Sequence, residues 1–464
     1  MKTFSLVSKW QAVYIFIAAI LVVSGGCASI DPVKERERHT DDFTTYLQTL
    51  EQRLLSHPFT LEECIQIAMT NNYTVRKADL DVQLAKFNRA MAFSAFLPQA
   101  VLSSGYTGYN KDPVSNPKDF RTTTLQVSMP VLAPATWFLY GAAKNGYASS
   151  KIAAAYIRQS ITLQTSISFY TLLVQQDTVK ALESQLAAAQ ELARRMDGLA
   201  EEGFLTAWER DQAKLMAESR EMELNHARRQ QILLQGELLQ ALGLSPLAHI
   251  ELSRDFSDVK APEGSVEELV LQALEIHPEL SLADRKIVML ENQVRQALAG
   301  FIPVVSIFAQ QTWYNKPMMD SPAMTTPAAI AFGNFTAVWN VFTGIANITQ
   351  HRAAKTAKAQ GWLERESTFL SVIVRVVSAE AALQDTREQR QVAQRSYDVA
   401  KGKSEDYDAR LEEGLIPSSD ALDARAAMDA AQLQLVQSQY LERIAIASLE
   451  LAMGIIGTLE TEEE

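Results

Sequence analysis

The chain has 464 residues, a formal net charge of -12 at pH 7 and a pI near 5.2. Phosphate binding needs concentrated positive charge, and the sequence shows no basic cluster, so the composition argues against a nucleic-acid partner. The six histidines show no paired ligand spacing, and neither a nucleophile elbow nor a dinucleotide fingerprint occurs. We therefore expect no catalytic residue, no metal site and no cofactor, and we infer that the chain is not an enzyme.

Residues 1–26 have the layout of a signal peptide. Lys2 and Lys9 precede an uncharged run at 12–23, which is too short to cross a bilayer comfortably, and small residues follow. The sequence Val-Ser-Gly-Gly-Cys then resembles a bacterial lipobox, apart from serine where leucine usually stands. This resemblance implies that Cys27 is lipidated; the alternative is an ordinary signal peptide with an incidental cysteine.

Residues 27–58 are charged and lack a strong apolar period, so we expect a lipid-anchored tether. Alanine follows the cysteine at position 28, which is similar to lipoproteins that are sorted to the outer membrane.

Nearly all of the remaining chain is a tandem duplication. The segment at 60–63 matches 265–268 at a shift of 205 residues, and Glu-Glu-Gly-Phe-Leu at 201–205 matches 412–416 at a shift of 211. Ordered matches at two related shifts predict two similar halves of one body. We place the first repeat at 59–250, a linker at 251–264, the second repeat at 265–457 and an acidic tail at 458–464.

Each repeat opens with helix and continues with β-strands. Capping-box patterns at 60–63 and 265–268 start helices that we expect to break near Asn72 and His277. In the β-rich segments that follow, apolar and polar residues alternate most clearly at 124–129, as in a sheet with lipid on one side and water on the other. The predicted strands are 99–109, 122–132, 304–314 and 329–342.

Each repeat ends in a long helical hairpin. The first arms are free of proline, and at 1.5 Å per residue each would be about 100 Å long. Gly203 and Gly414 end these arms, and returning helices complete hairpins at 135–243 and 344–454. The apolar heptad seam of the first arm is smaller or more polar in the second, so we expect the second arm to lie nearer water.

Four strands cannot close a barrel. The smallest single-chain membrane barrels use eight strands, and an open sheet edge cannot lie in hydrocarbon. If the strands lie in a membrane, three copies would supply twelve strands, which close. The predicted fold class is therefore mainly α, with long antiparallel hairpins and four strands per chain that complete a 12-stranded β-barrel as a homotrimer.

From about residue 59 to 457 the sequence resembles the TolC-like outer-membrane efflux factor family. The resemblance rests on the paired openings at 61–64 and 266–269, the prolines at 98 and 303, Met-Pro-Val-Leu at 129–132, the Glu-Gly turns and Ala-Leu-Gly at 241–243. It implies a trimeric barrel in the outer membrane that continues as an α-helical barrel across the periplasm. It also implies two partners, a periplasmic adaptor protein and an inner-membrane transporter.

Two groups of residues are candidate sites. Gly203, Phe204, Leu205, Gly414, Leu415 and Ile416 match the family's tip pattern, which implies contact with the adaptor; the alternative is that they are only hairpin turns. Glu405, Asp406 and Asp408 precede the second tip, and threefold symmetry would make each a ring at the periplasmic entrance. The alternative for these three is ordinary solvated helix charge.

The leading functional hypothesis is a passive outer-membrane exit duct of a tripartite pump that exports small molecules such as drugs, toxic compounds or metal ions. A type I protein secretion duct is one alternative. A periplasmic structural coiled-coil lipoprotein without a pore is another.

Overall fold

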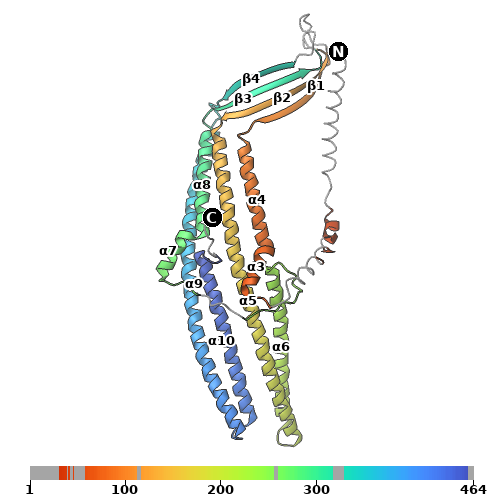
Figure 1. Ribbon diagram of the computed structural model, residues 1–464, viewed down its shortest axis with the longest axis vertical. Helices are drawn as coiled ribbons and strands as arrows, with labels where there is room; N and C mark the ends of the chain where they lie inside the picture. The colour runs from red at the N-terminus through yellow and green to blue at the C-terminus, as the bar shows by residue number, and fades with distance from the viewer. Residues whose placement is uncertain are drawn as a thin grey trace. The chain divides into compact units, whose positions relative to one another are not determined.

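The computed structural model describes residues 31–38, 40–41, 45, 58–111, 117–254, 260–316 and 329–457. The expected signal peptide, Cys27, most of the tether and the acidic tail lie outside these residues. The chain divides into two compact units, residues 1–58 with 248–251 and residues 59–247 with 252–464. The second unit contains all the helices and strands labelled α3–α10 and β1–β4 (Figure 1).

The order and length of the elements confirm the duplication. The first set is α3 (Leu61–Asn71), α4 (Tyr73–Ser94), β1 (Gln99–Gly108), β2 (Asp119–Leu132), α5 (Pro134–Glu201) and α6 (Ala207–Ala241). The second set is α7 (Val266–Ile276), α8 (Pro278–Ala299), β3 (Val304–Tyr314), β4 (Ala329–Val338), α9 (Ala346–Glu412) and α10 (Ser418–Met453). Both α3 and α7 have 11 residues, both α4 and α8 have 22, and α5 and α9 have 68 and 67.

Reciprocal capping boxes start both repeats. The Thr60 hydroxyl accepts the Glu63 N–H at 3.3 Å, and the Glu63 carboxylate accepts the Thr60 N–H at 2.9 Å. Ser265 and Glu268 make the same two bonds at the same distances. Because these bonds satisfy backbone donors that a helix start leaves open, the short helices begin at equivalent positions.

The helices break at Asn72 and His277 as expected, and each of these residues caps the start of the next helix. Asn72 Oδ1 accepts the N–H of Thr74 at 2.8 Å, and its Nδ2 donates to the carbonyl of Ala241 at 2.7 Å. In the second repeat His277 Nδ1 accepts the N–H of Glu279 at 3.2 Å. Different side chains therefore cap equivalent positions, at the starts of α4 and α8.

The four strands form one antiparallel sheet in the order β1-β2-β3-β4. Leu125 lies opposite Leu102 of β1 and Gln311 of β3, and alternate residues of β2 fall on opposite faces. Leu125, Val127 and Met129 thus share one face, as the sequence alternation predicted. Within the described part of the chain, β1 and β4 each have one unpaired edge.

The loop end of the sheet is longer than the sequence predicts. Strand β2 begins at Asp119 rather than at 122, because pairing with β1 continues to the bond from the Tyr109 N–H to the Lys118 carbonyl at 2.8 Å. Lys316, two residues after β3, donates to the Asp119 carboxylate at 2.7 Å. These contacts fasten β2 to both neighbouring strands at this end.

Strand β4 ends at Val338, so the prediction that it extends to 342 is wrong. The N–H of Val341 donates to the carbonyl of Trp339 at 3.0 Å, which turns the backbone away from β3. The Trp339 indole donates to the carbonyl of Phe301 at 3.0 Å. The apolar run at 339–342 is therefore a turn that leads into α9, although its composition is typical of a strand.

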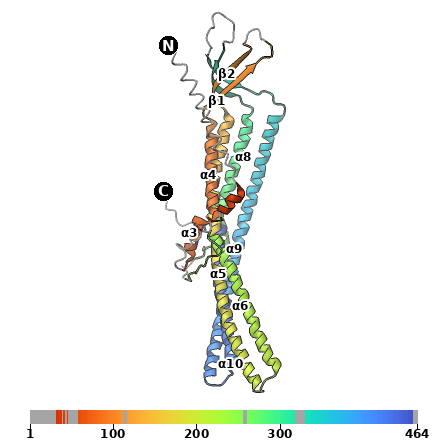
Figure 2. The ribbon, with the colours of Figure 1, turned by 90° about the vertical axis from the view of Figure 1, so that its right-hand side faces the viewer.

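Helices α4, α5, α8 and α9 lie side by side next to the sheet, with α4 and α9 at the two ends of this row (Figures 1 and 2). Farther from the sheet, α5 pairs with α6 and α9 pairs with α10 as two hairpins. Since α5 also contacts α10, the two hairpins are connected.

The buried apolar side chains lie along the lines of contact between neighbouring helices. Leu269, Val372, Val376, Leu449 and Met453 are at most 2% exposed and join α7, α9 and α10 in one cluster. Burial of each such side chain contributes about 1.5–3 kcal/mol. A smaller cluster around Val179, Leu224 and Ala227 joins α5 to α6.

The more polar seam of α9 is buried at two positions. Ala393 and Ser404 are 1% and 2% exposed. Small side chains let α9 and α10 approach closely, so these seam positions serve packing within the hairpin.

Candidate functional site at the helical tips

The first tip joins α5 to α6 through a turn that requires glycine. Gly203 has a φ of 79°, and the N–H of Phe204 donates to the carbonyl of Leu199 at 2.9 Å. Thr206 then starts α6 by donating its N–H at 2.9 Å and its hydroxyl at 2.6 Å to Glu209. These bonds to Thr206 lower the pKa of Glu209.

The second tip has the same turn and a different helix start. Gly414 has a φ of 73°, and the N–H of Leu415 donates to the carbonyl of Arg410 at 2.9 Å. Pro417 precedes α10 with an extended backbone and no side-chain cap, and its carbonyl accepts the N–H of Asp420 at 3.1 Å. The two tips therefore present the same backbone turn, followed by returning helices that start with different capping contacts.

Large apolar side chains project from both tips. Phe204 is 74% exposed and Leu415 is 68% exposed, whereas Leu205 and Ile416 are half-buried. The ends of the two hairpins lie close to one another, at the end of the helices away from the sheet (Figure 1). Exposed aromatic and aliphatic groups at such a position are typical of a protein contact.

Each carboxylate of the expected acidic ring has a basic partner in the same chain. Glu405 Oε1 lies 3.9 Å from Lys401 Nζ, and Asp406 Oδ2 lies 2.9 Å from Arg410 Nη2. In each pair the two residues are one turn apart on α9. Asp408 lies 2.9 Å from Arg425 of α10. Sequence reasoning missed these partners, although the spacing of four residues could have revealed the first two.

A crevice separates the two hairpins near the tips. It has a volume of about 550 Å³ and is lined by Glu405 and Asp408, with Ser184 and Glu191 on the facing helix. The Ser184 hydroxyl donates to Asp429 at 2.8 Å across it. Two of the three carboxylates thus face the other hairpin of their own chain.

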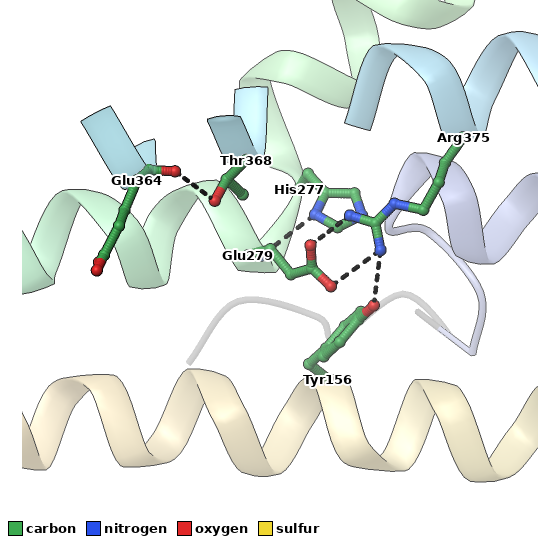
Figure 3. A network of polar contacts seen from close by, with 6 residues as sticks. All are labelled: Tyr156, His277, Glu279, Glu364, Thr368 and Arg375. Atoms are coloured by element: carbon green, nitrogen blue, oxygen red, sulfur yellow. Dashed lines mark hydrogen bonds and ion pairs between the residues drawn. The ribbon is translucent and has the colours of Figure 1, made fainter. Parts of the chain in front are cut away.

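A partly buried polar network lies where α8 begins (Figure 3). Arg375 of α9 donates through Nη1 to Glu279 at 3.0 Å and to the Tyr156 hydroxyl at 3.5 Å, and through Nη2 to the second oxygen of Glu279. The bond from Arg375 lowers the pKa of Glu279. This network connects α5, α8 and α9, and no local sequence pattern predicts it.

His277 is the least exposed member of the network, at 1%. Its Nε2 has no hydrogen-bond partner among the described residues, and burial lowers its pKa. Gly454 packs against the same helix start, where a Cβ would lie 2.8 Å from Pro278 Cδ. The site therefore favours the neutral imidazole.

The described residues contain no cluster of three or more His, Cys, Asp or Glu side chains able to hold a metal ion. Burial raises the pKa of Cys64 to about 12, so its thiol is unreactive. None of the described helices combines the length and hydropathy needed to cross a membrane.

The sequence model of the outer membrane efflux protein family matches residues 64–244 and 269–455. The chain belongs to this family. The two matched segments begin 205 residues apart and end 211 residues apart, the same shifts that define the duplication. Members of the outer membrane efflux protein family are transport channels of the outer membrane and not enzymes.

Solved channels share the fold. The Campylobacter jejuni outer membrane channel CmeC matches with a TM-score of 0.71 and 21% identity, over 85% of each chain. The Vibrio cholerae outer membrane protein VceC matches with a TM-score of 0.69 and 18% identity, over 85% of this chain and 96% of that one. A Pseudomonas aeruginosa membrane protein matches with a TM-score of 0.70 and 18% identity, over 85% and 92%. A search of curated proteins found no match.

Proposed function

We propose that three copies of the chain form an outer-membrane channel, and that this channel is the exit duct of a tripartite pump for small molecules such as drugs, toxic compounds or metal ions. One observation supports the proposal. The order of the strands in the sheet matches the order of the helices beside it, so both layers have their outermost elements on the same two sides. Strand β1 and helix α4 are the outermost elements on one side, and β4 and α9 are the outermost elements on the other. Joining β4 and α9 of one copy to β1 and α4 of the next closes both layers at once.

The open helix faces carry apolar stripes suited to such closure. Leu80, Leu84, Phe87 and Met91 follow one face of α4 and are between 57% and 67% exposed. On α9, Leu363, Leu370, Val374 and Val377 also follow one face and are between 43% and 72% exposed. Contiguous apolar surface of this kind is typical of an interface between subunits.

The proposal also assigns roles to the helical tips and to the N-terminal cysteine. Gly203, Phe204, Leu205, Gly414, Leu415 and Ile416 would contact a periplasmic adaptor protein, which in turn engages an inner-membrane transporter. Glu405, Asp406 and Asp408 would lie at the periplasmic entrance, and Cys27 would carry the lipid anchor. The exposure of Phe204 and Leu415 supports the adaptor contact.

The export role can be tested in the bacterium that encodes the chain. Deleting the gene should raise the accumulation of fluorescent dyes severalfold, and the wild-type chain should restore the original level. Phe204→Ser should restore export poorly although the channel assembles, because it removes an exposed tip contact. Met222→Ser is the matched control, since Met222 is 65% exposed on α6 away from the turn.

Unchanged accumulation of dyes and metal ions in the deletion strain would contradict the small-molecule role. Loss of a secreted protein from the medium in the same strain would assign the duct to type I secretion instead.

A further inference from the structure

The helical residues nearest the sheet are basic in an otherwise acidic chain. In α4, α5, α8 and α9 together, the twelve residues of each helix that adjoin the sheet include six basic side chains and one acidic side chain, Glu291. In α5, α6, α9 and α10, the twelve residues nearest the tips include eight basic and thirteen acidic side chains. We name the six basic residues the basic collar: Lys86, Arg89, Lys144, Arg295, Arg352 and Lys355.

Most of the basic collar lacks a counter-charge. Arg295 pairs with Glu291 at 3.1 Å, and Arg89 lies 4.7 Å from the centre of the Tyr147 ring. The other four side chains are exposed, and none makes an ion pair with a described residue. Exposed positive charge without nearby carboxylates favours an anionic partner outside the chain.

Two members of the collar occupy equivalent positions in the two repeats. Lys144 of α5 and Lys355 of α9 are 211 residues apart, the shift that relates the long helices. Seven residues before each, on the same helix face, stand Trp137 and Ile348, which are 50% and 48% exposed. The same stripe, an apolar residue followed by lysine, is thus present twice.

This stripe suits the outer boundary of a membrane. Tryptophan is enriched where a protein passes from hydrocarbon to headgroups, and lysine side chains extend toward phosphates from just beyond that level. Seven helical residues span about 10 Å, and a headgroup layer is roughly 5–8 Å thick. If Trp137 and Ile348 lay at the membrane surface on the outer side of a helical ring, the two lysines would reach the headgroup phosphates.

We propose that the basic collar binds anionic phospholipid headgroups in the periplasmic leaflet of the outer membrane and thereby fixes the depth of the channel. This inference rests on the proposed function, because it requires β1–β4 to lie in that membrane. Threefold symmetry would surround the channel with the collar. Salt would weaken the contact, because exposed charges are screened over about 10 Å at 0.1 M.

The test measures lipid preference around the reconstituted full-length channel. The wild-type chain and a Lys144→Gln/Lys355→Gln variant are placed in phosphatidylcholine vesicles that contain brominated phosphatidylglycerol, which quenches tryptophan fluorescence. Because one basic residue near an anionic surface is worth roughly a five-fold gain in binding, the wild type should prefer phosphatidylglycerol at least five-fold at low salt. The variant should show a clearly smaller preference, because it keeps only four of the six basic residues of the collar, and the wild type at high salt should show a preference near one.

The matched control is Lys401→Gln/Lys403→Gln, which removes two exposed lysines of α9 near the tip. This control should keep the wild-type lipid preference. Single-channel recordings on the same samples report insertion and ion selectivity independently of lipid binding.

Wild-type channels that conduct without preferring phosphatidylglycerol would overturn the collar inference and leave the proposed function intact. A double variant with altered ion selectivity and unchanged lipid preference would place the lysines in the lumen, which also overturns it. A wild-type chain that forms no channels would overturn both the proposed function and this inference.

Discussion

At the scale of single residues, the two repeats differ most informatively at Asn72 and His277. Both residues cap the second helix of their repeat, but Asn72 also donates to the carbonyl of Ala241 at 2.7 Å. His277 Nε2 has no such partner among the described residues, while Glu279, Arg375 and Tyr156 surround the ring. The second repeat thus places a titratable group where the first has a neutral amide.

This difference predicts that acid weakens the fold through His277. Burial lowers its pKa, so below the ordinary value of about 6.5 the unfolded chain takes up a proton that the folded chain resists. Stability is complete above that pH and falls below it, by up to about 1.4 kcal/mol per pH unit. Thermal unfolding followed by circular dichroism at pH 7.5 and 5.5 should show this loss in the wild type and a smaller loss in His277→Asn.

The control for this experiment is His226→Asn, because His226 is exposed. An acid-dependent loss of the same size in the wild type and in His277→Asn would show that the buried histidine is not responsible. Glu279, whose pKa Arg375 lowers, adds a loss of the same sign at lower pH, as that carboxylate takes up its proton.

At the scale of elements, the apolar stripe of α4 is predicted to be the face that meets the next subunit. Leu84→Glu would bury an unpaired charge there, and one such charge costs about 3–5 kcal/mol. The variant should therefore be mostly monomeric when measured by size-exclusion chromatography with light scattering. Gln83→Glu adds the same charge at the neighbouring exposed position and should leave the assembly unchanged. Equal assembly of the two variants would rule out this face as the interface.

Most elements could be predicted from local sequence, because caps, glycine turns and periodicity are local signals. The capping boxes at 60–63 and 265–268 and the turns at Gly203 and Gly414 fall where the sequence placed them. The end of β4 could not be predicted, since the run at 339–342 has the composition of a strand. What ends the strand is the turn at Trp339 and Val341, with the Trp339 indole bound to the distant carbonyl of Phe301.

At the scale of the whole molecule, the duplication predicted the architecture, but long-range polar contacts could not be predicted. Arg375 is 96 residues from Glu279 and 219 from Tyr156, so no local pattern connects them. The basic collar is likewise assembled from residues scattered over four helices, which explains why the sequence shows no basic cluster. The sequence pointed to the acidic candidates near the second tip. It did not predict the ion pair between Asp408 and Arg425, because these residues meet only when α9 and α10 fold into a hairpin.

Within the described residues the sheet has four strands with open edges at β1 and β4, so it must be completed by other copies of the chain. The most direct test is the native mass of the wild-type protein extracted from membranes in mild detergent. We predict a particle of three chains. A particle of one chain, stable in detergent with its sheet intact, would contradict it.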